Sequence, residues 1–113
     1  VSLLGQTYEK LGDYNYAASV YSNYLSNTPD AQIYNQLGLC DLKIGEYEAA
    51  LNAFQAGIAI EGNELMQVLK FNEIVAYEYL GDFKQATVLM QKYISTYPDD
   101  AKAQREYEFL QTR

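Results

Sequence analysis

The sequence has no histidine and only one cysteine, Cys40, among its 113 residues. A single thiol cannot form an internal disulfide, and without histidine it cannot complete a zinc-ligand set. The sequence also lacks a glycine-rich phosphate loop and a nucleophile next to a general base. Its neighbouring carboxylates are typical of solvated helix ends and faces: Asp99 with Asp100, and Glu106 with Glu108. We therefore expect no enzymatic activity, no metal and no other cofactor.

Positive charge is also scarce. Eight Lys and Arg residues stand against fifteen Asp and Glu residues, which gives a formal net charge of −7. The basic residues form no run, so most of the surface would repel phosphate backbones and anionic membranes. No apolar run approaches the ~18 to 20 residues that are needed to cross a bilayer. The sequence therefore predicts no nucleic-acid partner and no membrane insertion by this segment.

A short phrase occurs three times: an apolar residue, Gly, an acid, an aromatic residue, two further residues and Ala. Its glycines, Gly12, Gly45 and Gly81, lie 33 residues (12 to 45) and 36 residues (45 to 81) apart. Self-similarity at such a period indicates a repeat architecture in which each unit is one supersecondary piece. Gly suits the end of one helix, and the acid after it suits the start of the next. Each unit is therefore expected to be a helical hairpin.

The phrase and its surroundings resemble the tetratricopeptide repeat family over nearly the whole chain. The family's signature positions carry Leu4, Gly5, Tyr8, Gly12, Tyr14, Ala17, Tyr21 and Pro29 in the first repeat, Tyr34, Leu37, Gly38, Gly45, Tyr47, Ala50 and Phe54 in the second, and Tyr77, Gly81, Phe83, Ala86 and Pro98 in the third. The resemblance implies an all-α fold, a right-handed superhelix (solenoid) of three antiparallel helix hairpins plus a terminal helix, seven helices in all. It implies a single domain over 1–113, with repeats at about 1–30, 31–63 and 64–100 and a cap at 101–113.

The helices themselves are expected at about 1–11, 14–26, 31–43, 47–60, 64–80, 83–96 and 101–110. Asn63 is the expected N-cap of the fifth. Cys40 falls on a small position and is expected to be a buried structural thiol, with a reactive thiol as the alternative. Asp41 stands where the family places an aromatic residue. We expect its carboxylate to reach water at the edge of the hairpin, with a buried, pH-sensitive acid as the alternative.

The register of the fifth helix is ambiguous. Counting back from Gly81 places the charged Lys70 and Glu73 at inward positions. An alignment that is shifted by one residue, and that begins with Phe71, restores the apolar pattern. We expect the helix to absorb the mismatch by local distortion or altered packing within 74–80.

Function in this family usually lies on the concave face, which the first helix of each hairpin lines. The resemblance implies a peptide-binding groove formed by Gln6, Glu9, Lys10, Gln32, Asn35, Leu39, Leu42, Lys43, Phe71, Asn72, Val75, Glu78 and Tyr79. Such a groove predicts a non-catalytic protein–protein interaction module that binds a peptide or protein segment, extended or helical, through apolar anchors. The alternative is a structural assembly scaffold, or a homo-oligomer, formed through the helical ends.

Some members of the family hold the C-terminal carboxylate of chaperones with Lys, Asn and Arg at set groove positions. Those positions here carry Ser2, Gln6, Gln36, Val68 and Asn72. An anion needs charge-assisted donors, and none of these side chains is a cation. Carboxylate clamping is therefore not expected.

The compartment stays open. Enrichment in Tyr, Asn and Gln is similar to that of bacterial tetratricopeptide chains, some of which are lipid-anchored at the cell surface; a cytoplasmic bacterial protein is the alternative. Val1 is not an initiator Met and falls inside the first expected helix, so we expect that an upstream segment has been trimmed. The first residues lack the basic and apolar regions of a signal peptide.

Overall fold

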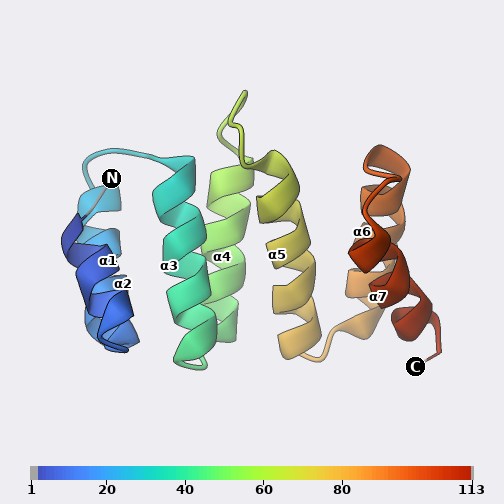
Figure 1. Ribbon diagram of the computed structural model, residues 1–113, viewed down its shortest axis with the longest axis horizontal. Helices are drawn as coiled ribbons and strands as arrows, with labels where there is room; N and C mark the ends of the chain where they lie inside the picture. Colours follow the sequence, from blue (N-terminus) through green and yellow to red (C-terminus); the bar gives the residue numbers. More distant parts are fainter. Residues whose placement is uncertain (1–2, 113) are drawn as a thin grey trace.

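The computed structural model describes residues 3–112, which form seven α-helices (Figure 1). Val1, Ser2 and Arg113 lie outside the described residues, and so do the expectations that fall on them. The helices are α1 (Leu3–Lys10), α2 (Tyr14–Leu25), α3 (Ala31–Lys43), α4 (Tyr47–Ile58), α5 (Met66–Tyr79), α6 (Phe83–Thr96) and α7 (Ala101–Gln111). The predicted all-α helical repeat solenoid is confirmed. None of the described helices has the length and apolar character needed to cross a membrane.

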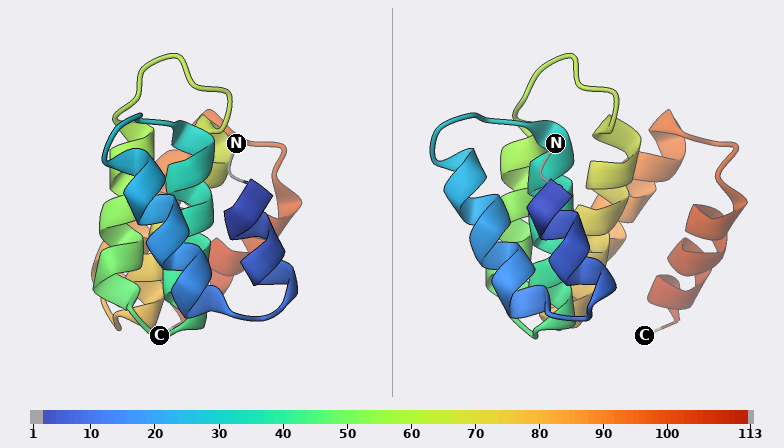
Figure 2. Two further views of the ribbon diagram at one scale, coloured as in Figure 1. Left: turned by 90° about the vertical axis from the view of Figure 1, so that its left-hand side faces the viewer. Right: turned by 60° about the vertical axis from the view of Figure 1, so that its left-hand side comes forward.

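The helices lie in two layers along a molecule of 40 × 29 × 20 Å. One layer holds α1, α3, α5 and α7, and the other holds α2, α4 and α6 (Figures 1 and 2). Each helix packs mainly on its neighbours in the chain, as expected for a repeat protein. The layer with α1, α3, α5 and α7 carries the predicted groove.

The same backbone motif ends α1, α3 and α5. Gly12, Gly45 and Gly81 have φ values of 79°, 83° and 80°, in the left-handed region. At the second turn the amide of Gly45 donates to the carbonyl of Leu42 at 3.3 Å, and the amide of Glu46 donates to the carbonyl of Asp41 at 2.8 Å. Equivalent bonds close the other two turns. This is the Schellman motif, in which Gly avoids the penalty that a Cβ would impose.

The acid after each of these glycines caps the next helix in two of the three repeats. The Oδ1 atoms of Asp13 and Asp82 each accept a hydrogen bond from a backbone amide of the following helix at 3.1 Å. Glu46 makes no such bond, although it holds the same place at the start of α4. The longer side chain is therefore not a substitute for Asp at this position.

Each hairpin is closed by a pair of residues, one seven positions before the turn glycine and one nine positions after it. The first two pairs are Gly5 with Tyr21 and Gly38 with Phe54, and a Cβ on either glycine would overlap the partner's ring. The third pair is Ile74 with Met90, both buried in one cluster. In this pair the first helix carries a larger side chain and the second helix a smaller one than in the other two pairs. The combined volume of the two side chains still fills the space between the helices.

The third pair settles the register of α5. Ile74 takes the place of Gly5 and Gly38, so the alignment counted back from Gly81 holds and the shifted alignment is wrong. Residues Met66–Tyr79 are α-helical throughout, so the expected distortion is absent up to Tyr79, and the alternative, altered packing, is what the pair of Ile74 and Met90 shows. Lys70 and Glu73 are half-buried rather than buried, because long side chains keep their charged ends at the edge of the packing.

Asn63 does not cap α5, contrary to expectation. The helix begins at Met66, and its N-cap position is Leu65, which has no capping side chain. The Asn63 amide instead donates to the carbonyls of Ile60 at 2.6 Å and Gly57 at 3.2 Å, while its oxygen accepts from the Leu65 amide at 2.9 Å. Asn63 therefore ties the end of α4 to the start of α5.

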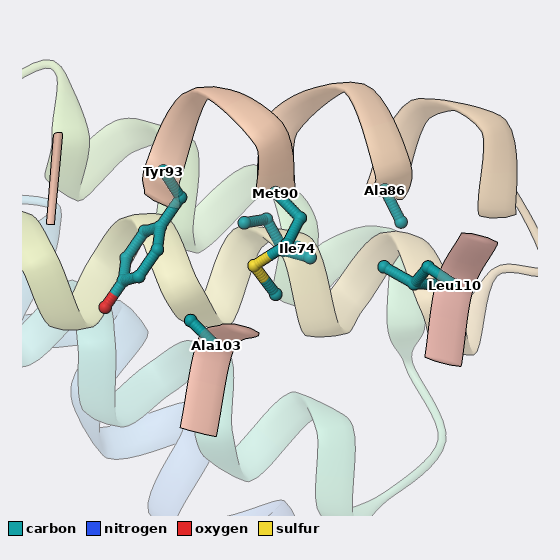
Figure 3. Close-up of a cluster of buried hydrophobic side chains, with 6 residues drawn as sticks. All are labelled: Ile74, Ala86, Met90, Tyr93, Ala103 and Leu110. Carbon is teal, nitrogen blue, oxygen red and sulfur yellow. The ribbon is translucent and has the colours of Figure 1, made fainter. Parts of the chain in front are cut away.

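Where one repeat packs on the next, a small residue on one helix faces a large residue on the other, and the helix that carries the large residue differs between two neighbouring junctions. At the junction of α4 with α5, Gly57 lies against the large side chain of Leu69. At the junction of α6 with α7, Tyr93 lies over the small Ala103, in a cluster with Met90 and Leu110 (Figure 3). The tyrosine ring is therefore part of the core and anchors the terminal helix.

Asp41 is buried, so the expectation that its carboxylate reaches water is wrong. Its side chain is 7% exposed, and burial, together with the nearby charge of Glu46, raises its pKa to about 6. Next to it, Cys40 is 1% exposed. Burial and the charge of Glu9 raise the pKa of the thiol to about 12, so the predicted buried thiol is confirmed.

Candidate functional site

The predicted groove residues all lie on α1, α3 and α5, the first helices of the three hairpins. They differ in how free they are to meet a ligand. Leu39 and Tyr79 are exposed, at 38% and 55%. Glu9 accepts a hydrogen bond from the Tyr21 hydroxyl, and half-buried Leu42 packs against the core cluster that contains Phe54. Glu9 and Leu42 therefore have structural roles.

Two aromatic contacts, equivalent between repeats, involve the predicted groove residues Lys43 and Tyr79. The Lys43 ammonium lies 5.9 Å from the centre of the Tyr14 ring. Thirty-six residues further on, Tyr79 stacks on Tyr47 with 4.9 Å between ring centres. In both cases the last turn of a first helix rests on the aromatic residue that starts the second helix of the preceding repeat. Both contacts join the first helix of one repeat to the second helix of the repeat before it.

A cleft opens where α5 faces α7, and it consists of two hollows. The large hollow has a volume of about 410 Å³, which falls within the range of about 300 to 1,000 Å³ typical of ligand sites. It is lined by Phe71, Val75, Glu78, Tyr79, Phe83, Lys102 and Glu106. The small hollow has a volume of about 230 Å³. It is lined by Gln67, Val68, Phe71, Asn72, Tyr93, Asp100 and Lys102.

The two hollows meet at Phe71 and Lys102, which line both. The Lys102 ammonium on α7 lies 5.2 Å from the centre of the Phe71 ring on α5. The Phe71 ring also packs edge-on against Tyr93, with 5.7 Å between ring centres. The boundary between the hollows is thus a cation resting on an aromatic face.

Asp100 is the fixed negative charge of the small hollow. Its Oδ2 accepts a hydrogen bond from the Tyr93 hydroxyl at 2.6 Å, and its Oδ1 accepts from the Ala103 amide at 3.1 Å, which caps α7. These bonds, first that from Tyr93, hold the pKa of Asp100 below its ordinary value. Burial is the main cause that raises the pKa of Tyr93 to about 12. The carboxylate is therefore ionised and the phenol neutral at physiological pH.

Amide side chains join α3 to α5 beside the small hollow. The Asn72 amide donates to the side-chain oxygen of Asn35 at 2.7 Å. This single bond leaves the Asn35 NH₂ group and the Asn72 oxygen available, because each amide carries both donors and acceptors. Close by in sequence, the side-chain oxygen of Gln36 is buried with no hydrogen-bond partner. Asn35, Gln36 and Asn72 thus place three amide side chains beside the small hollow.

Sequence reasoning missed the α7 side of the cleft. The groove predicted from the sequence contains no residue of the terminal helix. In the structure Ala103 and Leu110 of α7 are buried, while Lys102 and Glu106 line the cleft. The signal was present in the spacing, since residues four apart on a helix share a face and both flank Ala103.

The sequence matches the models of one protein family. A tetratricopeptide repeat family model matches residues 2–30 and 31–64, and a second tetratricopeptide repeat model matches residues 71–100. Comparison with curated proteins found no match.

Solved structures of the same fold are similar over most of the chain. The second TPR domain of human RPAP3, in complex with the HSP70 peptide SGPTIEEVD, is 20% identical, with a TM-score of 0.83 over 96% of this chain and 90% of that chain. PcrH, in complex with the chaperone binding region of PopD, is 24% identical, with a TM-score of 0.74 over 97% of this chain and 87% of that chain.

MamA is 26% identical, with a TM-score of 0.84. That match covers 95% of this chain and 62% of the MamA chain, so this chain spans less than two thirds of that protein. The repeats that the first family model matches make up more than half of the 113 residues, and they coincide with the hairpins described above. The chain belongs to the tetratricopeptide repeat family.

Proposed function

We propose that this chain is a non-catalytic module that binds a peptide or protein segment of a partner in its concave groove. The observation that carries the proposal is the cleft between α5 and α7, with a large hollow of about 410 Å³ whose wall includes the exposed ring of Tyr79. A cleft of this size with apolar walls and a few polar groups suits side chains of a partner. Similar structures that hold an HSP70 peptide or a region of PopD support an interaction module of this kind.

The bound segment is not proposed to be an acidic tail. The HSP70 peptide in the similar RPAP3 structure ends in Glu, Glu, Val and Asp. In this chain the clamp positions carry Gln6, Gln36, Val68 and Asn72 and no cation, and Glu78 and Glu106 add negative charge to the cleft. Tail peptides that end in acidic residues should therefore bind far more weakly than micromolar; micromolar binding in a titration would refute this part of the proposal.

The groove is tested by affinity capture with the protein and a Leu39→Arg, Tyr79→Ala double variant. The matched control is Val88→Arg with Tyr16→Ala, on α6 and α2 of the opposite layer. Val88 is 42% exposed against 38% for Leu39, and Tyr16 is 52% exposed against 55% for Tyr79. Tyr16 stacks on Tyr8 much as Tyr79 stacks on Tyr47, so both variants lose one ring contact. Circular dichroism verifies that all three proteins are equally helical.

A protein that is retained by the unaltered chain and by the control, but lost with the groove variant, would support the proposal. Equal retention by all three proteins would overturn it and direct attention to the other layer and the helical ends. Loss with both variants would also contradict it, since the groove would then have no special part in binding.

The alternative function is an assembly scaffold or homo-oligomer. The observation that favours it is the apolar surface of α1 and the turn that follows it, where Leu3, Leu4 and Leu11 are 75%, 55% and 72% exposed. Leu37, the counterpart of Leu4 in the second repeat, is instead packed against a core cluster. Light scattering over a range of concentrations tests this alternative. A dimer that is lost on Leu4→Ser with Leu11→Ser would favour it, and a concentration-independent monomer would exclude self-association.

A further inference from the structure

The contact between Lys102 and Phe71 spans the cleft from α7 to α5. The ammonium lies 5.2 Å from the ring centre, and both residues line both hollows. Lys102 is exposed on the first turn of α7, so its long side chain can leave the ring without unpacking the helix. The chain thus places one of its own cations on a ring that another cation could occupy.

The charges around this contact are unbalanced. The two hollows are lined by three carboxylates, those of Glu78, Asp100 and Glu106, and by one ammonium, that of Lys102. The chain as a whole has a formal net charge of −7. A cation that approaches the cleft meets an attractive field and an aromatic face, and arginine suits such a face better than lysine because its guanidinium is planar.

The large hollow offers a different chemistry next to the same contact. Its α5 wall is formed by Phe71, Val75 and Tyr79 along one face of the helix. Val75 is half-buried and Tyr79 is 55% exposed, so apolar surface remains in contact with water. Burial of a Leu, Met or Phe side chain from a partner would remove that surface from water.

The amide pair supplies contacts for a main chain. Asn72 lines the small hollow and is bonded to Asn35, which leaves the NH₂ group of Asn35 and the side-chain oxygen of Asn72 available. A peptide group has one N–H and one carbonyl, so it can bond to both. An extended segment that crosses from α5 to α3 can therefore be held by its backbone while its side chains enter the hollows.

We propose that the cleft recognises an extended segment in which a basic residue adjoins a large apolar residue. The basic side chain replaces the Lys102 ammonium on the Phe71 ring, next to Asp100, and the apolar side chain enters the large hollow against Val75 and Tyr79. Lys102 is then an internal competitor of the ligand. This inference rests on the groove function proposed above and specifies the chemistry of its partner.

The test is an array of acetylated, amidated octapeptides in which two adjacent central positions are varied over all residue types within a Gly-Ser background. Peptides with Arg or Lys beside Leu, Met or Phe should be retained most strongly. Replacement of the basic residue by Glu should weaken binding about tenfold or more, as for loss of a charge-assisted contact. Affinities of the selected peptides are then measured by fluorescence anisotropy.

Two variants address the mechanism. Lys102→Ala removes the internal competitor and should tighten binding of basic peptides about twofold to fivefold, the worth of an exposed cation–π contact. Phe71→Leu keeps an apolar wall but removes the aromatic face, and should reduce the preference for a basic residue. Lys92→Ala, which removes a cation from α6 outside this cleft, is the matched control and should leave binding unchanged.

Selection of acidic pairs, or no selection at the basic position, would overturn the inference, as would weaker binding by the Lys102→Ala variant. Failure of this inference can be distinguished from failure of the groove function. Peptides that bind and are lost with Leu39→Arg, Tyr79→Ala, but show no basic preference, overturn only the inference. Peptides that bind this groove variant equally well overturn the groove function too, and an array that retains no peptide overturns the inference.

Discussion

A Cβ placed on Gly38 would lie 2.7 Å from Cδ1 of Phe54, a ring that is completely buried. A glycine inside a helix normally costs about 0.5 to 1 kcal/mol relative to alanine, so Gly38→Ala on an open face would stabilise the fold. Here we expect the opposite sign, a loss of about 1 to 3 kcal/mol, because the added methyl group overlaps the Phe54 ring. Urea unfolding followed by circular dichroism measures the difference, and a gain in stability would show that the ring can move aside.

The third hairpin indicates how that loss can be recovered. Its corresponding residues are Ile74 and Met90, with a larger side chain on the first helix and a flexible one on the second. In a Phe54→Met background, Gly38→Ala should cost less than in the unaltered protein, with a coupling of about 0.5 to 3 kcal/mol in a double-mutant cycle. Additive effects of the two substitutions would contradict this account of the exchange.

The buried carboxyl of Asp41 should contribute more to the free energy of unfolding at about pH 4, where it is protonated, than at neutral pH, where it is charged. Its pKa rises from 3.8 in the unfolded chain to about 6 in the folded protein, so the folded state binds more protons between these values. The contribution of Asp41 to stability therefore falls as pH rises from about 4 to 6, and its penalty is complete above the folded pKa.

Asp41→Asn isolates that contribution. It removes the buried charge while it keeps the size of the side chain. We expect the variant to gain about 1 to 3 kcal/mol of unfolding free energy over the unaltered protein at pH 8, and much less at pH 4. Urea unfolding at the two pH values measures this. A difference that does not depend on pH would mean that the carboxyl is not desolvated.

Cys40 should react slowly in the native protein. The thiol is 1% exposed, and burial raises its pKa to about 12, so little thiolate is present at pH 8. Alkylation by iodoacetamide, followed by mass spectrometry, should be complete within minutes in denaturant and slower by orders of magnitude without it. Rapid modification of the folded protein would show that the hairpin opens locally at this position.

Much of the fold could be predicted from the sequence because its determinants are local. The boundaries of Ala31–Lys43 and Phe83–Thr96 agree with expectation, since a capping acid and the turn residues fix them. The start of the fifth helix was predicted too early. There Gly62 has a φ of 73°, and Asn63 bonds to both sides of the loop, contacts that no local pattern indicates.

The candidate site could be predicted only in part. Family positions placed the groove residues on α1, α3 and α5, where they are found. The other wall of the cleft depends on how α7 packs on α6, through Tyr93 over Ala103. The spacing of Lys102 and Glu106 places them on one face of α7, but it does not show that this face meets α5.

The hydrogen bond between Tyr93 and Asp100 should control how firmly α7 is attached. Asp100 bonds to the Tyr93 hydroxyl at 2.6 Å and caps α7 through the Ala103 amide at 3.1 Å. Asp100→Ala removes both contacts and should cost about 0.5 to 2 kcal/mol, with faster hydrogen exchange confined to the amides of α7. Asp99→Ala is the matched control, because that neighbouring exposed carboxylate lies outside the helix and is not its cap. Since the pKa of Asp100 is lowered in the folded protein, its contribution is present above the ordinary carboxyl range and lost only as pH falls through the lowered value. Equal exchange in the two variants would show that the apolar contact of Tyr93 with Ala103 holds α7 without help from the carboxylate.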